Sequence, residues 1–262
     1  MIYVSNCELK TIYQNLTKNF LVLTILLVTH VLKKIGIGIW KMKKDIRYIP
    51  CYSVSEAAFY LRLPVSTLRA WVGKQRGFEP LIALAQDKPP SLSFVNLVEA
   101  YVLAAIRRKY IISMTKVRQA IEYISEKFHS EHPLADKEFE IDGLHLFVHE
   151  YGTLINITQE EQIELEEIVK RYLKRIERDP KGLPVRLYPF SRTGGPDEPR
   201  LIIIDPQIAF GRPVLAAKSI PVEVIAERYR AGESIADLMY DYDCTQKEIE
   251  EAIRCELWRE AA

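Results

Sequence analysis

The stretch SVSEAAFYLRLPVSTLRAW, residues 53–71, holds two short apolar patterns separated by a break. The first pattern has the 3, 4, 7 spacing of one helical face and consists of Val54, Ala57, Ala58 and Leu61. Ser53 and Glu56 form the capping box that marks a helix start. Pro64 cannot lie inside this helix, but it can begin a second one. The second pattern consists of Val65, Leu68, Trp71 and Val72. The stretch therefore predicts a helix-turn-helix, whose second helix can enter a DNA major groove.

The polar residues of this region are the candidate DNA contacts. Short donors and cations on the polar side of the second helix can reach base edges and phosphates. The residues on that side are Ser66, Thr67, Arg69, Ala70 and Lys74. Cations that could clamp the flanking phosphate backbone are Arg62, Arg76, Arg107, Arg108 and Lys109. The alternative is a three-helix core that packs without binding a ligand. The density of cations favours double-stranded DNA as the partner.

The charge of the chain divides it into a basic and an acidic half. The formal net charge of the 262 residues is only +1. Residues 42–130, however, contain fourteen Lys and Arg against seven Asp and Glu, whereas residues 201–262 contain seven against twelve. Such asymmetry indicates that the first half meets a polyanion and that the second meets something else.

Composition restricts the class of protein. A chain of this length, 48% hydrophobic, is long enough for two or three small domains, each with its own core. The four cysteines show no Cys-x-x-Cys spacing, which argues against a zinc ribbon or a disulfide framework and favours a reducing cytoplasm. The apolar run Phe20 to Leu32 is shorter than the roughly 20 residues needed to span a bilayer. We expect no membrane association, and we expect residues 1–41 to be a misannotated or flexible extension, with translation starting at Met42.

The rest of the chain is predicted to be mainly α-helical. Residues 46–130 form the helical DNA-binding region, in which Lys116 and Arg118 are expected to point outward. From residue 131 to 190 we expect a small antiparallel β meander, because residues 138–157 alternate around Asp142-Gly143, followed by a helix.

A second domain is predicted after a break in composition. Residues 191–200, which include SRTGGPDEP, are a linker by composition. Residues 201–258 then contain three short helices with a second helix-turn-helix candidate. Its last helix is rich in Glu, so presenting it to a phosphate backbone would be repulsive.

No residue pattern indicates catalysis or a cofactor. His145 and His149 are expected to share one strand face, but two histidines without a third ligand are more often a polar face than a metal site. Gly194-Gly195 lacks the Lys-Ser/Thr of a phosphate-binding loop, and no nucleophile and base set emerges. We therefore expect no catalytic residue, no metal, no cofactor and no enzymatic activity.

Two resemblances refine these predictions. Residues 52–128 resemble the N-terminal region of MerR-type regulators, through VSEAAFYLRLPVSTLRAW and LSFVNLVEAYVLAAIRRKY, which implies a winged helix-turn-helix. Pro64 stands where those proteins usually have a small capping Ser or Thr. Residues 201–258 resemble the domain of unknown function 433, through IDPQIAFGRPVL and IPVEVIAERYRAGESIADLMYDYDCTQKEIEEAI. That family often has Gly-Thr-Arg before its Ile-Pro-Val, where this chain has Ala217-Lys218-Ser219.

The combination is similar to VapB-type antitoxins of this architecture. The resemblance implies a dimeric DNA-binding antitoxin that represses its own operon and neutralises a PIN-domain ribonuclease toxin. The alternative is a MerR-like transcriptional regulator whose C-terminal half is a sensor or dimerisation domain without a toxin. Tentative partner or dimer contacts are Arg212, Ile249, Ile253, Arg254 and Leu257.

Overall fold

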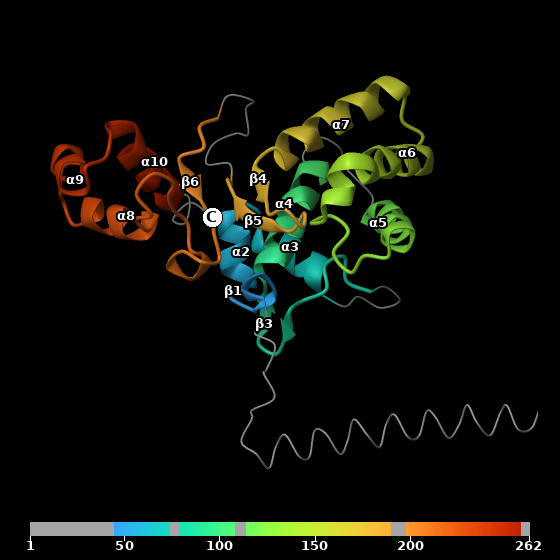
Figure 1. The fold of residues 1–262 in the computed structure, drawn as a ribbon, viewed down its shortest axis with the longest axis horizontal. Helices are drawn as coiled ribbons and strands as arrows, with labels where there is room; N and C mark the ends of the chain where they lie inside the picture. The colour runs from blue at the N-terminus through green and yellow to red at the C-terminus, as the bar shows by residue number, and fades with distance from the viewer. Residues whose placement is uncertain (1–44, 74–78, 108–113, 190–197, 258–262) are drawn as a thin grey trace, which may run out of the picture. The chain divides into compact units, whose positions relative to one another are not determined.

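The computed structural model describes residues 45–73, 79–107, 114–189 and 198–257. Its first elements build the predicted helix-turn-helix (Figure 1). They are η1 (Ile46–Tyr48), β1 (Tyr52–Ser53), α2 (Val54–Tyr60) and α3 (Val65–Val72). The capping box is confirmed, because Ser53 Oγ accepts from the Glu56 amide at 3.2 Å and Glu56 Oε2 accepts from the Ser53 amide at 2.8 Å. Pro64 occupies the N-cap of α3, as predicted.

A small sheet and two long helices complete this region. The elements are β2 (Gln86–Asp87), β3 (Pro90–Leu92), α4 (Phe94–Arg107) and α5 (Met114–Phe128). Strands β1, β3 and β2 pair antiparallel in that order, so a hairpin follows α3 where a winged helix-turn-helix carries its wing. Helix α4 is buried along almost its whole length. The prediction that Arg118 points outward is wrong: it is 7% exposed, and its Nε donates to the Glu79 carbonyl at 3.0 Å.

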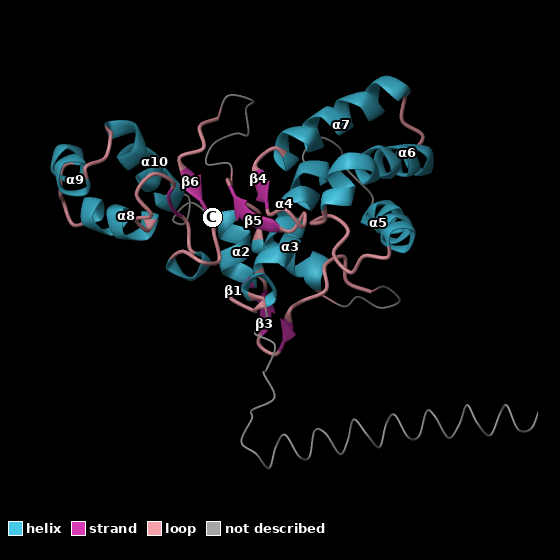
Figure 2. Ribbon diagram, in the orientation of Figure 1, coloured by secondary structure: helices cyan, strands magenta, loops and turns pink. Residues whose placement is uncertain are grey.

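The β meander predicted within residues 131–190 is wrong. Residues 139–155 form a π-helical turn, η2 (Phe139–Gly143), and a helix, α6 (Leu144–Ile155), before α7 (Gln159–Leu173). The buried side of α6 consists of Leu144, Phe147, Val148 and Tyr151, which is a 3, 4, 7 pattern. Packing of that face against neighbouring helices overrides the twofold alternation, and the predicted turn Asp142-Gly143 lies inside the π-helical segment. The fold is nevertheless mainly α-helical, and strands in other parts of the chain form small antiparallel sheets (Figure 2).

The connection between the two halves is built from short strands. These are β4 (Ile176–Arg178), β5 (Pro184–Leu187), β6 (Ile202–Ile203) and β7 (Val214–Leu215). Strands β4 and β5 pair with each other, as do β6 and β7, and Leu187 forms an antiparallel bridge with Ile204. Of the predicted linker 191–200, residues 191–197 lie outside the described ranges.

One buried arginine holds the chain on both sides of that segment. The Arg175 guanidinium donates to the carbonyl oxygens of Tyr188 at 2.7 Å and Pro189 at 3.4 Å. It also donates to those of Glu198 at 2.9 Å and Pro199 at 3.2 Å. Arg175 therefore joins the end of the first half to the beginning of the second.

The last part of the chain forms a three-helix domain. Its elements after β6 are η3 (Ala209–Gly211), β7, α8 (Val222–Arg230), α9 (Ile235–Tyr242) and α10 (Gln246–Leu257). They enclose a second core, which includes Leu215, Ile225, Leu238, Ile249 and Ile253. Ile249 and Ile253 are 0% and 6% exposed, so packing inside this domain explains them and the tentative assignment to a partner surface is wrong.

Candidate nucleic-acid interface

Helix α3 separates an apolar and a polar side. Its buried residues are Leu68, Trp71 and Val72. On the other side Ser66, Arg69 and Ala70 are exposed and Thr67 is half-buried. The structure thus brings these four predicted contact residues together on one accessible helical face. The faces are fixed by the packing of Trp71, whose carbonyl oxygen accepts hydrogen bonds from the amides of Leu81 and Ile82.

A basic hollow lies beside this face. It is open to solvent and is lined by Ser66, Thr67, Ala70, Trp71, Leu81, Arg107, Met114 and Arg118. The Arg107 guanidinium lies 6.0 Å from the centroid of the Trp71 ring, a cation–π distance that positions a cation at the C-terminal end of α4. None of the lining residues is acidic. We refer to this set as the basic hollow.

Arg118 lines this hollow, although the helical pattern of α5 predicted only a position facing solvent. Its Nε donates to the Glu79 carbonyl, which ties α5 to the segment that follows α3. Helical periodicity placed it on the solvent side of α5, since Val117 and Ala120 account for the apolar face. No sequence signal distinguishes it from a solvated arginine, because the contact is 39 residues distant along the chain.

Four of the predicted DNA contacts lie outside the described residues. They are Lys74 and Arg76, which follow α3 in sequence, and Arg108 and Lys109, which follow α4. Their contribution to binding stays a prediction.

Arg62 occupies the turn between α2 and α3 with a left-handed backbone (φ 53°). Burial raises the pKa of the Cys255 thiol on α10 to about 12, and the Arg62 charge acts against that rise, so Arg62 lies near the end of α10. Its role as a phosphate clamp stays a prediction.

The second helix-turn-helix lacks a comparable basic face. The two arginines proposed as partner contacts are engaged within the chain: Arg254 Nη1 lies 2.6 Å from Glu251 Oε2, and Arg212 Nη1 lies 3.3 Å from Glu223 Oε2. The side chain of Leu257 is outside the described set. Ion pairs neutralise the cations that this domain could offer to a phosphate, so α3 is the better candidate reader.

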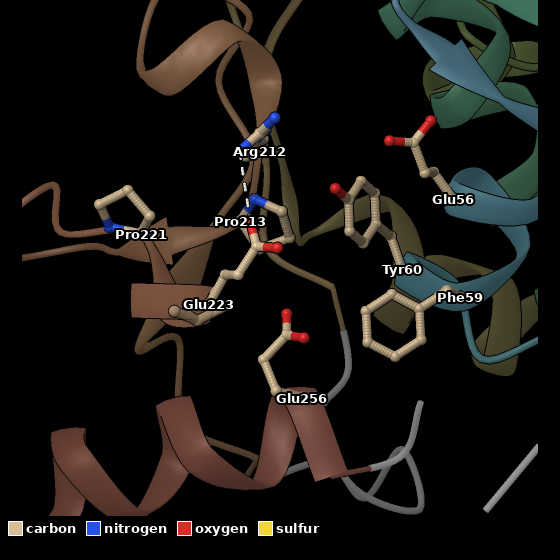
Figure 3. Close-up of a pocket in the computed structure, with 9 residues that line it drawn as sticks. Glu56, Phe59, Tyr60, Arg212, Pro213, Pro221, Glu223 and Glu256 are labelled. Carbon is tan, nitrogen blue, oxygen red and sulfur yellow. Dashed lines mark hydrogen bonds and ion pairs between the residues drawn. The ribbon is translucent and has the colours of Figure 1, made fainter. Parts of the chain in front are cut away.

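An acidic cleft separates α2 from the C-terminal domain (Figure 3). It encloses about 190 Å³, and its polar lining residues are Glu56, Tyr60, Arg212, Glu223 and Glu256. Glu56 and Tyr60 come from α2, Glu256 points into the space from α10, and Arg212 and Glu223 form their ion pair on the wall opposite α2. Burial raises the pKa of Tyr60, and the nearby carboxylates of Glu56 and Glu256 raise it further. The cleft is lined by residues up to 200 positions apart in the sequence, so no local sequence pattern predicts it.

The histidines provide no metal site among the described residues. His145 and His149 lie one turn apart on α6, a helix and not the predicted strand, and His145 Nδ1 lies 3.3 Å from Glu166 Oε2. No group of three or more His, Cys, Asp or Glu side chains in the described ranges could share a metal ion. Within the same ranges, none of the helices is long and apolar enough to cross a membrane.

Comparison with known proteins gives the two regions family matches. Residues 50–121 match the family described as "Putative DNA-binding HTH domain", and residues 202–254 match "Protein of unknown function (DUF433)". The chain is 26% identical over 237 residues to "Putative antitoxin VapB45" of Mycobacterium tuberculosis (strain ATCC 25618 / H37Rv), covering 80% of this chain and 95% of that protein.

Two further relatives come from the same organism. "Uncharacterized protein Rv2308" is 24% identical over 218 residues, which cover 77% of this chain and 88% of that protein. The crystal structure of Rv2018 from Mycobacterium tuberculosis superposes with a TM-score of 0.61 at 25% identity and covers 78% of this chain and 98% of that one. The chain therefore combines a helix-turn-helix domain matched by a DNA-binding family with a C-terminal domain of unknown function 433, and it is similar over most of its length to a protein named as a VapB antitoxin.

Proposed function

We propose that this protein is the DNA-binding antitoxin of a type II toxin–antitoxin system. It acts in the cytoplasm as a homodimer, binds operator DNA, represses its own operon and neutralises a PIN-domain ribonuclease toxin. The observation that carries the DNA-binding part is the exposed polar face of α3 beside the basic hollow. The similarity to a protein named as an antitoxin supports the toxin-neutralising part.

The geometry assigns different tasks to the residues of this surface. Short hydroxyl side chains at Ser66 and Thr67 can approach base edges in a major groove, and Arg69 can reach either a base edge or a phosphate. Arg107 lies at the border of the hollow, where a phosphate would meet a cation held over an indole ring. Phosphate contacts supply affinity and base contacts supply sequence preference. A MerR-type regulator would bind DNA through the same surface. Binding of a toxin is therefore the property that distinguishes the two candidate functions.

The DNA-binding surface can be tested with charge-matched variants. Arg69→Ala and Arg107→Ala should each weaken binding to the DNA upstream of the gene by about 1–3 kcal/mol. Loss of a phosphate contact should also lower the slope of log K against log salt by about 0.9. Arg171→Ala removes the same charge from the exposed side of α7 and should leave both quantities unchanged. Binding is measured by fluorescence anisotropy at several salt concentrations.

The outcomes distinguish the candidate functions. Equal loss in Arg171→Ala would mean that net charge, and not α3, governs binding. Unchanged DNA affinity in both Arg69→Ala and Arg107→Ala would exclude the α3 face and the basic hollow as the DNA-binding surface. DNA binding without copurification of any protein encoded by the neighbouring reading frame would favour the MerR-like regulator.

A further inference from the structure

Phe210 is an aromatic side chain presented almost entirely to solvent. It is 92% exposed and lies in η3, inside the segment matched by the DUF433 family. Its backbone is left-handed, with φ values of 46° at Ala209, 57° at Phe210 and 78° at Gly211. Residues other than glycine adopt this conformation at an energetic cost, and such strain persists only where the surrounding structure imposes it. A glycine or a small polar residue would adopt this left-handed conformation at a lower energetic cost.

The loop around Phe210 is held firmly on both sides. Before it, Asp205 Oδ1 accepts from the Gln207 amide at 2.8 Å, and Asp205 Oδ2 lies 3.0 Å from the Arg186 Nε atom. After it, the buried Tyr52 hydroxyl donates to the Gly211 carbonyl at 3.0 Å. A Cβ atom at Gly211 would lie 2.2 Å from that hydroxyl oxygen, so the close approach requires glycine. These contacts fix the direction in which the neighbouring aromatic ring leaves the surface.

A fixed, exposed aromatic is what a protein interface uses as an anchor. Interface hot spots are enriched in aromatic residues that fill a pocket on the partner, and a preorganised loop loses little entropy on binding. DNA is disfavoured as the occupant, because residues 201–262 as a whole contain twelve Asp and Glu against seven Lys and Arg, and the acidic cleft follows at Arg212. At about 190 Å³, that cleft is also smaller than typical small-molecule pockets of ~300–1,000 Å³.

Charge complementarity points to a basic protein. Residues 201–262 contain seven Lys and Arg against twelve Asp and Glu, and the cleft holds three carboxylates against one guanidinium. A partner with an apolar pocket beside basic side chains would match both features. A ribonuclease needs a basic surface to bind its polyanionic substrate, so a ribonuclease toxin has the required chemistry.

We infer that Phe210 is the anchor through which the C-terminal domain binds the basic, RNA-binding face of the toxin. This inference rests on the proposed antitoxin function. Phe210 enters an apolar pocket of the toxin, and the negative net charge of residues 201–262 attracts the basic side chains around that pocket. The DNA-reading α3 and the toxin-binding Phe210 are then separate surfaces of one chain.

The test compares two exposed aromatic residues of the same domain. Phe210→Ala should weaken binding of the purified protein encoded by the neighbouring reading frame by about 30-fold or more, the size expected of a hot spot. Phe210→Gly should weaken it equally while raising the melting temperature, because glycine relieves the positive φ. Tyr240→Ala, at a residue 88% exposed on α9, should stay within twofold of the unsubstituted chain. Affinities are measured by calorimetry on the full chain.

Each alternative occupant gives its own result. Loss of dimerisation in sedimentation, with toxin binding intact, would identify a second copy as the partner of Phe210 and overturn the inference. Loss of promoter binding alone would do the same in favour of DNA. Toxin binding within twofold in both Phe210 variants would refute the anchor while leaving the antitoxin function standing. If the unsubstituted chain does not bind the neighbour-encoded protein, the antitoxin function fails and the inference falls with it.

Discussion

At the scale of single residues, a buried glutamate in α4, Glu99, is paired with one histidine, His132. Glu99 is 3% exposed, and its Oε2 lies 3.0 Å from His132 Nδ1 and accepts from Asn96 Nδ2 at 3.2 Å. Burial would lower the pKa of His132, but the hydrogen bond and charge of Glu99, together with Asp136 and Glu131, outweigh it and raise that pKa. Burial also raises the pKa of Glu99. Folding therefore takes up protons at this pair.

This pair predicts a pH dependence of stability. The contribution of His132 should be fully present below its unfolded pKa of about 6.5 and should be lost as pH rises through the higher pKa of the native state. The free energy of unfolding, measured by urea denaturation from pH 6 upward, should therefore fall. The double variant His132→Ala with Glu99→Gln should remove this dependence, whereas His132→Ala alone leaves the raised pKa of Glu99 and should cost about 3 kcal/mol, since the buried carboxyl loses its ionic partner.

Two variants check that assignment. His149→Ala, on the exposed side of α6, should preserve the slope. Glu99→Gln in the His132→Ala background should recover part of the loss, because the buried charge is gone. A pH slope that survives the double substitution would assign it to other groups.

At the scale of elements, helix caps could be predicted from sequence because they depend on neighbouring residues. Ser53 and Glu56 cap α2 as expected, and Thr158 with Glu161 caps α7 in the same way. The segment 138–157 could not be assigned so directly, because its residues satisfy both a twofold and a 3, 4, 7 pattern. Tertiary packing decides between them: a Cβ at Gly152 would lie 2.6 Å from atoms of Gln162, so α6 and α7 pack closely at this glycine.

The cap of α2 predicts a specific loss of stability. Ser53→Ala should lower the free energy of unfolding by about 1 kcal/mol, since it leaves the Glu56 amide without its acceptor. Ser55→Ala, in the first turn of the same helix and also exposed, should be neutral or slightly stabilising because alanine has the higher helix propensity. Equal changes in the free energy of unfolding of the two variants, measured by urea denaturation, would show that the capping box does not stabilise α2.

At the scale of the whole molecule, the sequence predicted two regions but not how they join. The join consists of contacts distant in sequence: the bridge between Leu187 and Ile204, the Tyr52 hydroxyl on Gly211, and the Arg186–Asp205 ion pair. Ile204 is fully buried in the first core, although it belongs to the segment of the second domain. The residues of α3 are neighbours in the chain, so α3 could be predicted as a candidate site. The residues of the acidic cleft are distant in sequence, so the cleft could not.

Ile204 therefore predicts cooperative behaviour. Ile204→Ala should cost about 3 kcal/mol and should increase hydrogen exchange both in β4–β5 and in α8 and α10. Ile163→Ala, at a residue 54% exposed on α7, should change neither. Faster exchange confined to the C-terminal helices would mean that the domains open independently.

The position of Arg175 has a consequence for how this protein can vary. Because one guanidinium holds the backbone at Tyr188 and Pro189 together with that at Glu198 and Pro199, the span between these points is set by hydrogen bonds and not by chain length. Insertions, deletions or a protease cut between residues 190 and 197 should therefore leave the two halves associated.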